Sequence, residues 1–223
     1  MNDPMMREFP DVLALDVAFL EIERDARAIV DGVREAEGTW RAAPASWTVA
    51  ECLDHLAVGN RVYLDAMRPA AARARTRGRL RRGPARPGLV GGWFVRWLEP
   101  PVTRRRTIAA PAKIRPRLGP TLASAAQDFI ASHDAVRGFL REYAHLDLAS
   151  VRFPNPFIRG VRFSLATGLH VIAAHERRHL WQARNVATDA ASALAAELSR
   201  GMCSALEGRI QVWRRGMGAP HKH

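Results

Sequence analysis

The segment from His175 to His179 reads H-E-R-R-H and restricts the fold of this chain more than any other segment. Residues four apart lie on one face of an α-helix, so both imidazoles can reach the same divalent metal ion. Apolar side chains recur at helical spacing around the pair, at Leu165, Leu169, Ile172 and Leu180. We therefore expect a helix that turns both histidines inward, toward other helices of an α-helical protein.

A metal site of this kind needs a third ligand, because two nitrogens rarely hold a metal ion tightly. The best further donor is His55. Thr48 and Glu51 have the spacing of a capping box, which predicts a helix start that places His55 about two turns in. The alternative interpretation is that these histidines are packing residues, hydrogen-bonded inside a helix bundle.

The same five residues also match the signature of zincin metallopeptidases. In such an enzyme Glu176 would be catalytic and polarise a zinc-bound water, and Glu197, 18 residues after His179, would be a further ligand. However, the sequence shows no alternating β pattern for a substrate-aligning edge strand and no third histidine at metzincin spacing. The zincin interpretation is therefore the weaker one.

Two motifs resemble those of the DinB-like superfamily, also described as thiol-dependent S-transferases, which are small metal-binding four-helix bundles of bacteria. One is W-T-V-A-E-C-L-D-H-L, from Trp47 to Leu56, and the other is H-E-R-R-H-L-W-Q, from His175 to Gln182. The resemblance implies an all-α bundle over residues 1–186 in which His55, His175 and His179 are the metal ligands. Glu51 and Gln182 lie close enough along their helices to orient ring nitrogens of these ligands.

The resemblance also implies a chemistry, in which a small thiol attacks an electrophilic substrate at the metal, or a related hydrolysis. Imidazole ligands suit zinc, nickel, iron or copper, and zinc is the default expectation. A non-enzymatic alternative stays open, in which the metal only stabilises a binding module. The sequence therefore predicts a divalent metal ion more firmly than it predicts a reaction.

Hydrophobic periodicity predicts four bundle helices and one added helix. We expect them at Asp11–Glu37, at Thr48–Met67 with Pro69 as its end, at Pro120–Tyr143, around the H-E-x-x-H motif, and at Thr188–Trp213. Residues 151–156 predict an irregular loop with short extended pieces. Residues 187–223 are expected to form a C-terminal helical extension with a disordered tail, and the added helix packs either on the bundle or on a second subunit of a homodimer.

Residues 68–118 form a long basic insertion between the second and third helices. It holds fourteen arginines and one lysine against Glu99 alone, a charge of +14; since the whole chain carries +12, the remainder carries −2. An apolar, aromatic stretch at 91–98 lies between the basic flanks. Three interpretations of the insertion stay open. It is a solvated loop with an apolar piece packed on the bundle, it binds an anionic membrane, or, less well supported, it binds the nucleic-acid backbone.

The remaining signals concern location and the other histidines. Residues 1–10 show no secretory leader, and no apolar run reaches the roughly eighteen residues that cross a bilayer, which favours a cytoplasmic protein that is at most peripheral to the membrane. Cys52 and Cys203 have no metal-binding spacing. We expect His133 and His145 to be surface or cap residues, and His170 to be rotated off the ligand face.

Overall fold

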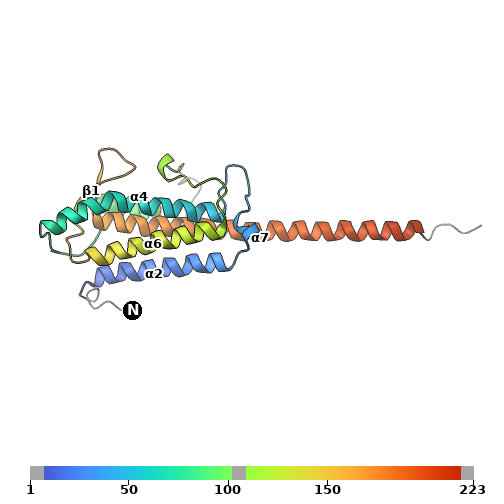
Figure 1. Ribbon diagram of the computed structural model, residues 1–223, viewed down its shortest axis with the longest axis horizontal. Helices are drawn as coiled ribbons and strands as arrows, with labels where there is room; N and C mark the ends of the chain where they lie inside the picture. Colours follow the sequence, from blue (N-terminus) through green and yellow to red (C-terminus); the bar gives the residue numbers. More distant parts are fainter. Residues whose placement is uncertain (1–7, 102–108, 217–223) are drawn as a thin grey trace, which may run out of the picture.

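The computed structural model describes residues 8–101 and 109–216, and the side chains among them up to Met202 together with Glu207. This part of the protein is all-α apart from one small hairpin, as predicted (Figure 1). Four long helices make the bundle: α2 (Pro10–Asp31), α4 (Val49–Thr76), α6 (Leu122–Tyr143) and α7 (Leu165–Gly216). The shorter elements are α3 (Glu35–Gly38), α5 (Leu89–Leu98), the 3-10 turn η2 (Ala112–Ile114) and the antiparallel strands β1 (Arg152–Pro154) and β2 (Arg162–Ser164).

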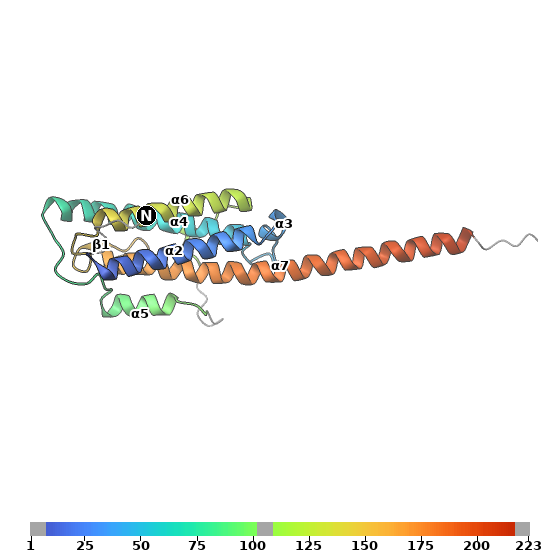
Figure 2. The same cartoon turned by 90° about the horizontal axis from the view of Figure 1, so that it is seen from below.

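The arrangement of the four helices explains why the insertion is long. Helices α2 and α4 each pack against both α6 and α7 and so lie diagonally across the bundle. Asn60 contacts Ser132 near the middle of α4, and Arg75 contacts Glu142 near its end, so α4 and α6 run in the same direction. The chain between two parallel helices must return along the whole bundle, and residues 77–121 make that return (Figure 2).

Local signals placed several helix ends correctly. Thr48 and Glu51 form the expected capping box at the start of α4, with the Thr48 hydroxyl accepting from the Glu51 backbone N–H at 3.0 Å. At the start of α6 the Thr121 hydroxyl accepts from the Ser124 backbone N–H at 3.1 Å. The first helix is shorter than predicted, because the chain leaves α2 at Gly32 and resumes as the separate single turn α3.

The prediction that Pro69 ends the second helix is wrong. Helix α4 continues through Pro69 to Thr76. A proline inside a helix deprives the carbonyl four residues earlier of its partner, but both Asp65 and Pro69 are exposed, so this carbonyl lies on the solvent side. On the opposite side Ala70 and Ala71 are buried in the core, and this packing holds the helix together.

The added C-terminal helix is not a separate element. Helix α7 runs without interruption for 52 residues, so the expected boundary at 186/187 falls inside one helix. No glycine or proline occurs between Gly168 and Gly201 to stop it. Its second half extends beyond the bundle in both views, and the side chains of Leu198 and Met202 there are 63% and 67% exposed (Figures 1 and 2).

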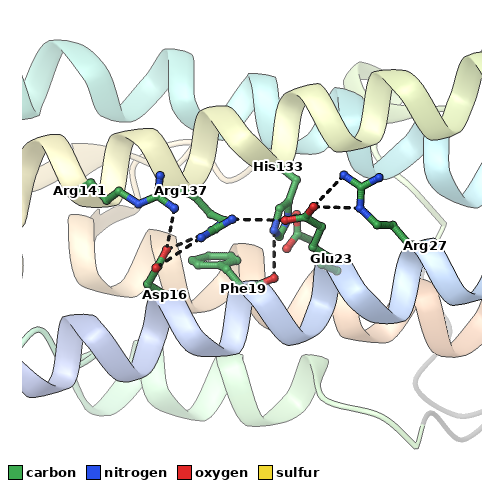
Figure 3. A network of polar contacts seen from close by, with 8 residues as sticks. Asp16, Phe19, Glu23, Arg27, His133, Arg137 and Arg141 are labelled. Atoms are coloured by element: carbon green, nitrogen blue, oxygen red, sulfur yellow. Dashed lines mark hydrogen bonds and ion pairs between the residues drawn. The ribbon is translucent and has the colours of Figure 1, made fainter. Parts of the chain in front are cut away.

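A row of ion pairs fastens α2 to α6 along one side of the bundle (Figure 3). Arg137 of α6 contacts Asp16 at 3.1 Å and Glu23 at 3.3 Å, and Arg141 reaches Asp16 at 3.5 Å. Phenylalanines from α2 and α6 and leucines from α4 and α7 fill the core behind this row. These contacts fix the helices whose inner faces carry the polar groups described next.

Among the described residues, no helix is long and apolar enough to cross a membrane. The apolar stretch of the basic insertion instead forms α5, which packs on the outside of α7 (Figure 2). Its Phe94 ring lies 5.9 Å from that of Phe163 in β2, the strand that precedes α7. The later part of the insertion returns over α4 at η2.

Candidate metal centre

Three histidines from two helices converge near one end of the bundle. His55 lies in the second turn of α4, and His175 and His179 lie one turn apart on α7. One nitrogen from each ring lies within 4.8 Å of the others, and the Nε2 atoms of His55 and His175 are 3.0 Å apart. The structure thus brings together the three residues that the sequence singled out as a ligand set.

Two of these rings are held by a hydrogen bond from Nδ1, the ring nitrogen that faces away from the cluster, to a carbonyl oxygen. Nδ1 of His55 donates to the backbone carbonyl of Ile114, and Nδ1 of His179 donates to Oε1 of Gln182 at 3.0 Å. A carbonyl oxygen only accepts hydrogen bonds, so the proton of each ring sits on Nδ1. Nε2 therefore presents its lone pair toward the centre of the cluster, as a metal ligand requires.

Glu51 does not orient His55, contrary to expectation. Its Oε2 accepts from the Thr48 backbone N–H at 3.0 Å in the cap of α4, and its Oε1 accepts from Arg41 at 2.6 Å, so both oxygens have other partners. The carbonyl of Ile114 holds His55 instead. No sequence signal points to Ile114, because a backbone carbonyl has no residue-type signature and this one lies 59 residues away.

Neighbouring residues fit the shape of the cluster. Gly59 lies beneath the ring of His175, and a Cβ added there would stand 3.3 Å from its Cε1, which is tighter than ordinary packing. The Trp47 ring lies 4.6 Å from that of His55 and 5.6 Å from that of His179. The tryptophan that begins the first motif is therefore one wall of the site.

Burial keeps all three imidazoles neutral. It lowers the pKa of His55, opposed in part by the hydrogen bond to Ile114. Burial and the neighbouring imidazoles lower the pKa of His175 well below its ordinary value and that of His179 to about 3. Neutral imidazole is the form that binds metal, so the cluster is ready to ligate across the neutral pH range.

The three histidines of the cluster differ in burial. His55 is 1% exposed, whereas His175 and His179 are only partly buried. Between these two histidines on α7, Arg177 forms an ion pair with Glu99, the residue that follows α5. The part of the cluster that solvent touches therefore belongs to the two α7 histidines.

Glu176 points away from the cluster into a separate buried network. Its Oε1 accepts from Asn60 at 2.8 Å and from Nδ1 of His133 at 3.0 Å, while Nε2 of His133 donates to the carbonyl of Phe19 at 3.0 Å. Glu176 and His133 are both fully buried. Because both ring nitrogens of His133 face acceptors, the geometry is that of an imidazolium paired with a carboxylate.

The environment of His133 corrects a second expectation, that it is a surface or cap residue. Burial lowers its pKa, but the hydrogen bond and charge of Glu176 outweigh this effect, and the pKa lies above its ordinary value. Its partner is 43 residues away on another helix, and nothing local to His133 in the sequence indicates the pair. His170, as expected, lies outside the cluster and bonds the carbonyl of Ala85 at 3.2 Å.

The zincin arrangement is absent from the described residues. The Glu176 carboxylate is committed to Asn60 and His133 rather than to the three histidines. Glu197 lies 18 residues beyond His179 on the same continuous helix, a separation of about 27 Å at 1.5 Å per residue. It cannot ligate an ion held by His179.

Comparison with known families agrees with the fold and the motifs. A family model described as DinB superfamily matches residues 18–183, a range that includes all three histidines and the whole insertion. No curated protein and no solved structure shows significant similarity to the chain.

Proposed function

This chain belongs to the DinB superfamily, and we propose on that premise that it is an enzyme whose activity depends on one divalent metal ion held by His55, His175 and His179. The reaction class is transfer of a low-molecular-weight thiol to an electrophilic substrate, with hydrolysis as the related alternative. Zinc is the first metal to test, followed by nickel and iron.

One observation carries the metal assignment: three neutral imidazoles converge, and carbonyl oxygens hold two of them with Nε2 facing inward. Three nitrogen ligands with solvent on one side are typical of a catalytic site, whereas structural zinc sites have four protein ligands. The donor set therefore suits a borderline divalent ion and leaves room for a substrate.

When bound, such an ion supplies Lewis acidity and lowers the pKa of a thiol or water that it holds. The protein supplies the rest. Gln182 and the Ile114 carbonyl keep two rings in the ligating tautomer, and Trp47 shields one side of the cluster. In thiol transfer, a bond forms between the thiol sulfur and an electrophilic carbon, the bond to the leaving group breaks, and the thiol proton departs with that group.

The first experiment measures bound metal in the untagged protein by mass spectrometry, beside single alanine variants of His55, His175 and His179. We expect about one metal ion per chain in the parent protein and a sharp loss in each variant. His170→Ala is a matched control, because His170 is a partly buried histidine on the same helix outside the cluster. Full retention of metal by His179→Ala would overturn the assignment.

Activity is then tested with common cellular thiols and a panel of electrophiles, comparing metal-loaded, metal-stripped and His55→Ala protein. If the protein is instead a metal-stabilised binding module without enzymatic activity, it should bind metal without turnover, and the ion should have no ligand position that exchanges with solvent. The proposed enzyme predicts the opposite, an exchangeable position that a thiol competes for. Spectroscopy of the cobalt-substituted protein during thiol titration distinguishes the two.

A further inference from the structure

Helix α5 has two different apolar faces. The inner face packs on α7 and β2: a Cβ added at Gly91 would lie only 2.6 Å from Thr167, Leu98 is 7% exposed, and the Phe94 ring lies 5.9 Å from that of Phe163, tilted to it. These contacts fix the orientation of the helix on the bundle. The side chains on its other side therefore face away from the protein.

An ordinary surface helix has a polar outer side, but the outer side of α5 is apolar. Leu89, Val90 and Trp93 are 95%, 77% and 61% exposed. At 100° per residue they occupy one arc of about 100°, and Arg96, three residues after Trp93, widens this arc by about 20°. We call these four residues the outer α5 face. In Figure 2, α5 lies outside the four-helix bundle beside α7. The high exposure of Leu89, Val90 and Trp93 means that no described residue covers these side chains.

The charge around the outer α5 face is strongly positive. Several arginines of the insertion are used internally, such as Arg81 with Asp11 and Arg117 with Asp54. Among the residues the structure describes, Arg86, three positions before Leu89, and Arg96 form no ion pair. Arg86 and Arg96, which are exposed and lie close to Leu89, Val90 and Trp93 in the sequence, therefore add positive charge beside the exposed apolar side chains.

We propose that the outer α5 face is a peripheral docking surface for an anionic lipid bilayer. Exposed leucine and valine gain free energy by entering the acyl boundary, and tryptophan favours the headgroup level. Arg86 and Arg96 flank these residues at the position where lipid phosphates and carboxylates would lie. The helix lies in the interface and does not span it.

Charge and chemistry favour this partner over two others. A second copy of the chain packed through the same face would bring its own Arg86 and Arg96 against those of the first, and these like charges repel each other. Nucleic acid would use the arginines and Trp93, but it would leave the aliphatic side chains of Leu89 and Val90, which have no ring for base stacking, without a partner. Because only three apolar side chains insert, docking is reversible and depends on anionic lipid.

The test is flotation of the full-length chain with vesicles of phosphatidylcholine alone or with about 30 mol% phosphatidylserine. We expect co-flotation only with the anionic vesicles, and release at about 0.5 M salt. The double variant Leu89→Ser, Val90→Ser should abolish flotation, and Arg86→Gln with Arg96→Gln should weaken it roughly 30-fold. These residues are exposed, so the fold is unaffected, which circular dichroism checks.

Two matched controls separate this face from general surface effects. Leu118→Ser removes another exposed leucine of the insertion, 98% exposed and outside α5, and Arg24→Gln removes an exposed arginine of α2. Both should float like the parent chain. Absence of binding to anionic vesicles, equal binding to neutral ones, or equal loss in the controls would overturn the proposal. Binding to DNA but not to anionic vesicles would overturn it in favour of a polyanion site.

Discussion

Replacing Glu176 with alanine should destabilise the protein strongly while leaving the metal content of the folded chain unchanged. The carboxylate is fully buried and accepts from Asn60 and His133. Removing one partner of a buried ion pair costs about 3–5 kcal/mol, because the other charge stays buried without compensation. A domain is stable by only about 5–15 kcal/mol, so this loss is a large part of the total.

Glu176→Gln separates the charge from the hydrogen bonds. The amide oxygen of glutamine can still accept from Asn60, but His133 loses its counter-charge. In the parent the pKa of His133 is raised, so its contribution to stability is complete below its unfolded pKa of about 6.5 and is lost as the pH rises through the folded pKa. The glutamine variant should lack this decline in stability above pH 6.5.

The assay is urea unfolding followed by far-ultraviolet circular dichroism, with bound metal measured on the same samples. For Glu176→Ala, the expected loss corresponds to a fall in midpoint of about 2 M at a slope near 2 kcal/mol/M. Glu142→Ala is the control, because its exposed pairing with Arg75 should contribute less than about 1 kcal/mol. A Glu176→Ala protein as stable as the parent, or one that folds but loses its metal, would refute the reasoning.

Three further predictions follow from the geometry. Gln182→Ala frees the ring of His179 and should weaken metal binding about 10–100-fold, as measured by competition with a chelator. Gly91→Ala forces a methyl group against Thr167 and should cost about 1–3 kcal/mol, with faster hydrogen exchange across 89–98 and no change at the metal; unchanged exchange would contradict the tight packing of α5. The pKa values of His175 and His179 are lowered in the fold, so the unfolded chain binds more protons than the folded chain below pH 6.5. The metal-free protein should therefore lose stability as the pH falls from about 6.5 toward 3, by up to about 1.4 kcal/mol per pH unit for each histidine. Urea unfolding measures this loss, and a flat acid profile would count against the lowered pKa values.

Much of the fold was readable from short-range pattern. The capping box of Thr48 and Glu51 and the helical spacing of His175 and His179 depend on residues three or four positions apart, and the structure has both as predicted. The length of the return between α4 and α6 also followed from the basic insertion. Family resemblance, carried by the same two motifs, then pointed to His55 as the third member of the cluster, and the structure brings it there.

Other features came from contacts between distant segments. Pro69 reads as a helix end on local propensity, yet packing of the neighbouring alanines continues α4 through it. His133 reads as a surface residue until α6 and α7 are brought together and bury it against Glu176. The assignment of Glu51 to His55 fails because a closer partner, Arg41, and the Thr48 backbone use its oxygens.

There is a physical reason why some features could be predicted from the sequence and others could not. Helical spacing, caps and charge runs are properties of a few adjacent residues, so the amino-acid order specifies the two-histidine helix, the start of α4 and the basic insertion directly. Which atoms meet across the bundle depends on how the helices pack. The carbonyl of Ile114 on His55, the Glu176–His133 pair and the orientation of α5 on α7 each join residues more than forty positions apart, and their energies exist only after the bundle has formed.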